Sequence, residues 1–463
     1  MTGETQIITP GASAAAPRTR TRKQAVQDEI AAVRPRPRRD PAIWGIYAFL
    51  IFVSIVELFS ASSREIVGGN ILGPISRHAF LLFIGFIIMI CLQRIHYRHF
   101  YRWTYVIVGL SVLSVFYTMF FGVVINGARR AFSLFGLCTV QPSELIKFSA
   151  ALIIARLLCN YRVHYKKGLI EEYKRYNHRL VGVVAGIVLF FGALLIKQGM
   201  TNTLLMMVIS TAMMIIGGVR WKELFCVWGV YAVIAGGYYF VKYSDVGEKM
   251  FGTEQAEGMS DAEAIASGRE FDRQATHKNR ISNFLRPDKY KDKITSDNAQ
   301  EMYSFIAQAN GGVVGRFPGN SRETARLPLA FSDYIYAIII EDTGLIGGAF
   351  LLFAYLCLLW RAGYIASQCK KAFPALLVIG MAVFIVCQAL VHMGIVTGCL
   401  PVSGQPLPLI SKGGSSVIVT SIALGMMLSV SRFALRKGQR QEANDRIARL
   451  SDDDAMPDNP TQI

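Results

Sequence analysis

Charged side chains are scarce in this sequence, at 17% of 463 residues, whereas soluble proteins carry about 25%. Cysteine is also sparse, because only eight are present and no two form a CxxC pair. The low charge excludes an ordinary soluble enzyme, and the scattered cysteines argue against a zinc site or a disulfide framework. Acidic residues are fewer than basic residues, at 32 against 49.

Apolar residues are abundant instead, at 52% of the chain, and they gather in long continuous runs. About 20 helical residues cross the hydrocarbon core of a bilayer, and a helix satisfies its own backbone hydrogen bonds there. The runs therefore predict an all-α integral membrane protein with about ten transmembrane helices. They lie near 42–61, 76–93, 104–125, 143–159, 180–196, 201–219, 222–241, 329–360, 372–398 and 414–434.

Basic residues are concentrated in alternate connections between these runs. With the N-terminus inside, the cytoplasmic segments hold about 28 Lys and Arg, against about 6 in the short outer loops. This asymmetry predicts that both termini are cytoplasmic, and it argues against nucleic acid as a partner. The expected organisation is a disordered basic arm (1–41), a membrane body (42–434) with a large extracytoplasmic loop (242–328) between helices 7 and 8, and a cytoplasmic tail (435–463).

The connection between the third and fourth runs carries a cluster of charges. Arg129 and Arg130 precede Ser143, which is a natural N-cap, and Glu144 and Lys147 share one face of the helix that follows. A helix N-terminus with nearby cations suits an anion, a phosphate group in particular. Alternatively, Glu144 and Lys147 form a structural pair, and the two arginines reach toward lipid headgroups.

Two further stretches are rich in glycine and proline. The 311–321 segment has no preceding strand and no GKS or GKT ending, so it indicates tight turns rather than a nucleotide loop. The 404–416 segment predicts a re-entrant turn buried in protein, whose amides suit an anion. Asp333 and Glu341 open the eighth run, where Ser332 or Asp333 is alternatively a helix cap. Together these elements predict an outward-facing anion cavity.

These stretches together resemble the SEDS family of FtsW- and RodA-like membrane proteins. The resemblance covers about residues 42–434 and rests on several motifs in family order. They are Asn126–Arg130, Gln141–Lys147, Gly311–Ser321, Phe331–Gly344 with its Ser-Asp-Tyr-Ile-Tyr core, and Pro401–Ser416. The Pro-Gly-Asn-Ser sequence at 318–321 is more similar to the FtsW-like branch than to the RodA-like branch.

The resemblance implies an inverting peptidoglycan glycosyltransferase in the bacterial inner membrane. Its substrate is lipid II, a disaccharide-peptide on undecaprenyl diphosphate, polymerised during septal cell wall synthesis. Implied partners are a class B penicillin-binding transpeptidase and other divisome membrane proteins, and Mg or Mn is the implied cation, although no ligand cluster in the sequence identifies it. The implied substrate contacts are Arg129, Arg130, Glu144, Lys147, Asp333, Glu341, Ser411, Lys412, Gly413, Gly414 and Ser415.

The resemblance also implies a general base in the long outer loop. The family has an aspartate a little before a Tyr-Gln pair, and anchoring on Gln300 selects Asp297. Ala299 stands in place of the tyrosine, so Asp292 remains an alternative base. A structural role is also open, in which Asp297 caps the helix that follows.

Departures from the family pattern keep other functions open. Ala131 stands where Trp is usual, Lys412 where Tyr is common, and the 197–202 segment lacks the usual acidic residue. A lipid II flippase also needs many spans and buried cations, such as Lys147 and His392. The remaining alternatives are an elongation-type, RodA-like polymerase and a divisome scaffold without activity.

Overall fold

The structure is a computed structural model, and its described part belongs to a single compact unit, Arg38–Ala434. The predicted arm, the predicted tail and most of the long outer loop lie outside the described residues. The described residues are 40–61, 72–125, 128–134, 138–166, 170–196, 199–243, 284, 294, 298–327, 331–369 and 371–433.

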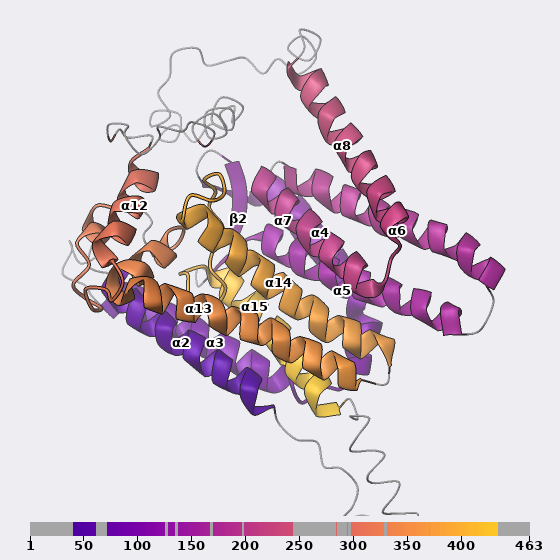
Figure 1. Cartoon of the computed structure of the whole chain (residues 1–463), viewed down its shortest axis with the longest axis horizontal. Helices are drawn as coiled ribbons and strands as arrows, with labels where there is room; N and C mark the ends of the chain where they lie inside the picture. Colours follow the sequence, from indigo (N-terminus) through magenta and orange to yellow (C-terminus); the bar gives the residue numbers. More distant parts are fainter. Residues whose placement is uncertain are drawn as a thin grey trace, which may run out of the picture. The chain divides into compact units, whose positions relative to one another are not determined.

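Long helices make up most of the described part (Figure 1), which confirms that the fold is mostly helical. Ten of them have 18 residues or more, and each overlaps one of the predicted apolar runs. They are α2 (Pro41–Ala61), α3 (Leu72–Leu92), α4 (Tyr97–Phe121), α5 (Pro142–Lys166), α6 (Ile170–Ile196), α7 (Met200–Gly217), α8 (Trp221–Tyr243), α13 (Ile335–Gln368), α14 (Ala372–Val396) and α15 (Gly414–Phe433). Two shorter elements, α12 (Ala299–Gly311) and η3 (Glu323–Ala325), precede α13.

Five of the long helices are apolar enough along a sufficient length to cross a membrane. They are α2, α4, α13, α14 and α15. The most apolar windows of α14 and α15 are 72% and 83% buried, against 22% for α4. Helices α14 and α15 therefore form the centre of the bundle, where α14 packs against α5, α7, α13 and α15. Helix α4 lies at the edge of the bundle.

Small residues allow the close contact between α3 and α15. A Cβ atom on Gly425 would lie 2.9 Å from the Leu92 Cβ, and one on Gly85 would lie 2.5 Å from the Ser421 Oγ. Membrane helices gain packing energy through such contacts, because lipid supplies no hydrophobic drive between apolar surfaces.

The connection between α4 and α5 is a small sheet, which the sequence analysis did not predict. Its antiparallel strands, in the order β1-β2-β3, are β1 (Val123–Ile125), β2 (Ala128–Leu134) and β3 (Cys138–Val140). The β-branched run in β1 favours an extended chain. The sheet contacts α4 and α15, and it places Arg129 on β2, in register with Val124.

One buried carboxylate joins three helices at the end of the bundle where α2 begins. Asp40 is 1% exposed, and its Oδ1 accepts the backbone N–H of Ala42 in the first turn of α2. Arg361 of α13 donates to both Asp40 oxygens at 3.0–3.2 Å, and the Ser431 Oγ of α15 donates to Oδ2 at 3.1 Å.

Substituting Asp40→Ala is expected to lower the free energy of unfolding by about 3 kcal/mol, because Arg361 then loses its carboxylate partner in a largely buried position. Thermal unfolding of the purified protein in detergent measures the effect. Ser431→Ala, which removes only one hydrogen bond, is the matched control and is expected to cost about 1 kcal/mol. Equal unfolding temperatures for Asp40→Ala and the wild type would contradict this role.

Candidate functional site

The predicted Glu144–Lys147 pair is present on α5 and is completely buried. The Lys147 Nζ donates to the Glu144 Oε1 at 2.7 Å, and the two residues are 0% and 1% exposed. The predicted cap is wrong, however, because α5 begins at Pro142 and Ser143 already lies in its first turn. Proline is favoured there because its fixed φ fits a helix start and its missing N–H is not needed.

The 404–416 segment, which was predicted to be re-entrant, supplies one further contact to Lys147 of this pair. The Gln405 Oε1 accepts from the Lys147 Nζ at 3.2 Å, and the Gln405 Nε2 donates to the Asn202 Oδ1 of α7 at 2.9 Å. The Gln405 carbonyl oxygen accepts from the Nδ1 of His392 on α14 at 2.6 Å. One residue of a non-helical segment thus binds polar groups on α5, α7 and α14.

Several acceptors in this buried network have no hydrogen-bond partner among the described residues. They are the Glu144 Oε2, the Gln388 Oε1 and the His392 Nε2. The His392 Nδ1 donates to a carbonyl, so in a neutral ring Nε2 is the unprotonated nitrogen and an acceptor. The Gln388 Nε2 donates to the Pro406 carbonyl at 3.3 Å. The network therefore holds one cation, the kind of group that binds phosphate, and several spare acceptors, which suit hydroxyl groups.

The end of the re-entrant segment contacts the residues that precede α13. The buried Ser411 Oγ donates to the Ser332 carbonyl at 2.8 Å and accepts the Leu407 N–H at 2.7 Å. Lys412 is half-buried, with its Nζ 4.4 Å from the centre of the Phe331 ring. Of the next predicted contacts, Gly413 directly precedes α15, and Gly414 and Ser415 are its first two residues.

The two acidic residues predicted at the start of the eighth run lie in different places. Asp333 packs against the re-entrant segment, since a Cβ on Gly404 would lie 2.7 Å from its Oδ2. Glu341 lies two turns inside α13, where its Oε1 accepts the Arg322 N–H at 2.9 Å. Neither Ser332 nor Asp333 is the helix cap, because Tyr334 occupies that position without a side-chain hydrogen bond.

A second polar cluster, which the sequence analysis missed, lies between α2 and α13. The Asp342 carboxylate accepts from the hydroxyls of Ser60 and Ser321. Glu57 lies near it, is 2% exposed, and has an Oε2 with no partner among the described residues. A lone acid in the apolar 42–61 run was the only available signal for Glu57.

The structure thus divides the expected site into two clusters. The 404–416 segment joins α5, α7 and α14, whereas the 311–321 segment joins α2 and α13. Asp297 and Asp292 lie outside the described residues, and so do the side chains of Arg129 and Arg130. The α12 helix begins at Ala299 after Asn298, which makes no side-chain cap.

No grouping of three or more His, Cys, Asp or Glu in the described part of the chain is suited to hold a metal ion. The Mg or Mn that the resemblance implies stays a prediction, since such an ion is often held by one or two carboxylates together with the phosphates of the substrate.

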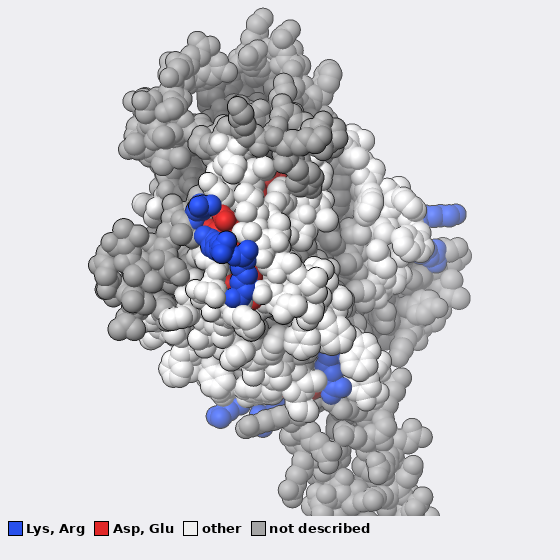
Figure 2. Space-filling view, turned by 60° about the vertical axis from the view of Figure 1, so that its left-hand side comes forward, with Lys and Arg blue, Asp and Glu red and all other residues white. Residues whose placement is uncertain are grey.

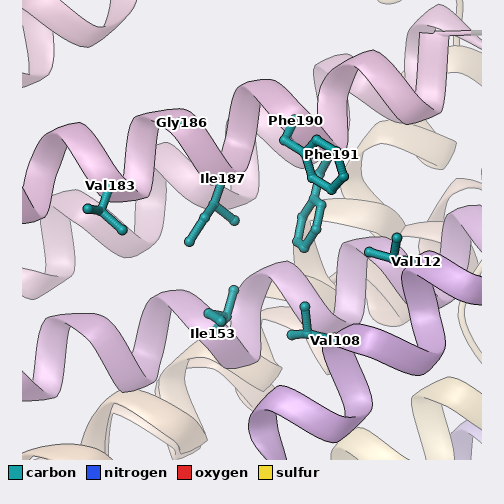
Figure 3. Close-up of a pocket in the computed structure, with 8 residues that line it drawn as sticks. All are labelled: Val108, Val112, Ile153, Val183, Gly186, Ile187, Phe190 and Phe191. Atoms are coloured by element: carbon teal, nitrogen blue, oxygen red, sulfur yellow. The ribbon is translucent and has the colours of Figure 1, made fainter.

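The cavity in Figure 3 is apolar. It measures about 350 Å³ and lies between α4, α5 and α6. Val108, Ile153 and Phe191 are among its lining residues, and no charged side chain lines it. It is therefore not the predicted anion cavity.

Comparison with known proteins decides the family. The sequence profile of the cell cycle protein family of FtsW, RodA and SpoVE matches residues 40–436. The chain belongs to this family. Membership, together with the five candidate spans, makes the protein a multi-pass membrane protein of the bacterial inner membrane.

Relatives within this family carry an enzyme name. "Probable peptidoglycan glycosyltransferase FtsW" of Dichelobacter nodosus is 29% identical over 71% of this chain and 74% of its own length. The protein of the same name in Bacillus subtilis is 27% identical over 83% of this chain and 87% of its own length.

Solved structures share the fold. A chain from a study of how a peptidoglycan synthase complex coordinates polymerization and crosslinking matches with a TM-score of 0.61. It is 21% identical, and the match covers 85% of this chain and 98% of that one. Thermus thermophilus RodA, also 21% identical, matches with a TM-score of 0.55 over the same shares of the two chains.

Proposed function

We propose that this family member is a peptidoglycan glycosyltransferase that polymerises lipid II during bacterial cell division. The observation that carries the proposal is the family match over residues 40–436, with relatives named for this activity. The name FtsW, shared by these relatives, favours the division role over elongation. The buried Lys147 and the amide-rich 404–416 segment add chemistry suited to a lipid diphosphate.

The reaction needs a base and a group that stabilises the leaving diphosphate. The 4-hydroxyl of the incoming lipid II attacks the anomeric carbon of the growing glycan, the bond to the diphosphate breaks, and the anomeric centre inverts. Asp297 takes the hydroxyl proton, with Asp292 as the alternative. Lys147, Arg129, Arg130 and the start of α15 offset the negative charge of the leaving group.

Lys147 cannot meet a diphosphate while its ammonium group is enclosed by Glu144 and Gln405. Binding of the substrate therefore requires the re-entrant segment to move away from α5. Under this proposal, Gln405 holds Lys147 between catalytic cycles, and Asn202 and His392 hold Gln405.

The topology and partners belong to the same proposal. Ten spanning helices place both termini in the cytoplasm and the 242–328 loop outside, as the distribution of Lys and Arg favours. A class B penicillin-binding transpeptidase is the proposed partner, supported by the similar fold of a chain from a peptidoglycan synthase complex. Other divisome membrane proteins complete the assembly.

Substituting Asp297→Asn is expected to abolish polymerisation of labelled lipid II, because a general base contributes about 100-fold or more to the rate. The assay uses the purified full-length protein with its transpeptidase partner, and gel analysis separates the glycan products. Asp292→Asn is the matched control in the same loop and is expected to retain activity.

Three outcomes would contradict parts of this proposal. Full activity of Asp297→Asn with loss in Asp292→Asn would make Asp292 the base. Movement of lipid II across sealed vesicles without polymer formation by the wild type would favour a flippase. Normal growth of cells carrying Asp297→Asn, Arg130→Gln and Lys147→Met, with defects only on tail truncation, would favour a scaffold.

A further inference from the structure

Backbone hydrogen bonds fix the turn after α12 to α13, well past the first residue of that helix. The backbone N–H of Arg316 donates to the Glu341 carbonyl at 3.0 Å, and that of Phe317 donates to the Asp342 carbonyl at 2.7 Å. In the opposite direction, the backbone N–H of Leu345 donates to the Gly312 carbonyl at 3.0 Å. Since a helix rises 1.5 Å per residue, the contacts at 341–345 lie about 9–15 Å along the axis from Ile335.

This turn presents an apolar tip. Val313, Val314 and Phe317 are 62%, 69% and 72% exposed, and Phe317 adopts a φ of 70°, which is rare for an aromatic residue. The neighbouring Leu345 and Ile346 of the spanning helix α13 are 60% and 61% exposed. The tip therefore lies at the same depth as side chains that suit the hydrocarbon core of a membrane. Its apolar surface is favoured at that depth, because it is removed from water there.

Arginines adjoin the apolar tip. Arg316 is half-buried, and Arg322 and Arg326 are exposed in the segment that follows. Arg326 is 3.7 Å from the Glu323 Oε1, with a side chain 66% exposed. Figure 2 shows Lys and Arg side chains gathered in a stripe across the described surface, with only small acidic patches beside it.

We propose that the 311–326 segment is a binding surface for an anionic phospholipid of the outer leaflet. Val313, Val314 and Phe317 lie among the acyl chains, and the guanidinium groups of Arg316 and Arg322 bind the headgroup phosphate. Two observations favour this occupant: the positive charge beside the tip, and the position of the tip against the lipid-facing side of α13. The placement in the outer leaflet rests on the proposed topology, whereas the lipid contact itself does not.

Photo-crosslinking tests the surface. The full-length protein is reconstituted in nanodiscs of phosphatidylcholine that contain photoreactive phosphatidylglycerol or, in a parallel sample, photoreactive phosphatidylcholine. Mass spectrometry then measures labelling of the 311–326 segment. Labelling by the anionic lipid is expected to exceed that by the zwitterionic lipid at least about fivefold, since each arginine near a headgroup favours binding by about that factor.

Matched variants distinguish the effect of the arginine charges on labelling from the effect of the apolar tip. Arg316→Gln/Arg322→Gln is expected to reduce phosphatidylglycerol labelling to the phosphatidylcholine level, and Phe317→Ser to reduce both. Arg220→Gln/Lys222→Gln, at the exposed junction of α7 and α8, leaves labelling of 311–326 unchanged.

Equal labelling by the two lipids, or no effect of the arginine substitutions, would overturn the proposal. Loss of the labelling when the transpeptidase partner is added would assign the surface to a protein contact instead. Suppression by an equimolar amount of undecaprenyl diphosphate would assign it to the lipid carrier. Either result replaces the phospholipid as occupant.

Discussion

Lys147→Met is expected to destabilise the protein more than any other single substitution of a predicted site residue. The ammonium group is 0% exposed and lies 2.7 Å from a carboxylate that is also buried. Removing it leaves the Glu144 charge without a partner, which costs about 3–5 kcal/mol. The Gln405 Oε1 loses its donor at the same time. Thermal unfolding in detergent measures the loss.

A paired substitution distinguishes a structural role from a functional one. Glu144→Gln/Lys147→Met removes both charges, so most of the stability is expected to return, because replacing a buried ion pair by neutral groups of similar size is often close to neutral. Lipid II polymerisation is nevertheless expected to stay about 100-fold or more below wild type, since the leaving diphosphate has lost its cation. A stable and fully active double variant would make the pair purely structural.

Local patterns were sufficient for much of this fold. Long apolar runs determine helices because a membrane leaves the backbone no other partner, and ten such runs predicted the ten long helices. The Glu144–Lys147 contact follows from a spacing of three residues on a helix. The prolines and glycines of 404–416 predicted a non-helical re-entrant turn, and the structure confirms a buried, non-helical backbone over 405–411, before α15 begins at Gly414.

Contacts between distant segments could not be predicted in the same way. Gln405 and Asn202 are 203 residues apart, and Ser60 and Asp342 are 282 apart. No spacing rule pairs them, because the packing of whole helices decides which polar groups meet. Ser143 resembled a cap by residue type, yet the preceding Pro142 already fits the first helical position.

The glycine-rich stretch at 311–321 was predictable in its local conformation but not in its packing partner. Its glycines predicted tight turns, and Gly312, Gly315 and Gly319 do have positive φ angles. Its partner was not predictable, since nothing in the sequence indicates that this turn packs against a kink in α13 at Gly344.

Gly344→Ala is therefore expected to detach the 311–317 turn from α13. Gly344 has a φ of 73°, and a Cβ there would lie 2.2 Å from the Val313 carbonyl oxygen. The backbone strain and the overlap together are expected to cost about 3 kcal/mol. Gly315, on the other side of this contact, is expected to tolerate alanine equally poorly, because a Cβ there would lie 2.3 Å from the Asp342 carbonyl oxygen. Thermal unfolding in detergent and limited proteolysis at 311–317 measure the two effects.

Gly363 on the same helix is the matched control. A Cβ there has nothing within 4 Å, so Gly363→Ala is expected to raise the free energy of unfolding by up to about 1 kcal/mol through helix propensity. Opposite signs for the two glycine-to-alanine changes would show that Gly344 is required by a close backbone approach rather than by flexibility of α13. If both variants unfold at the wild-type temperature and resist the protease equally, the turn is not held by this contact.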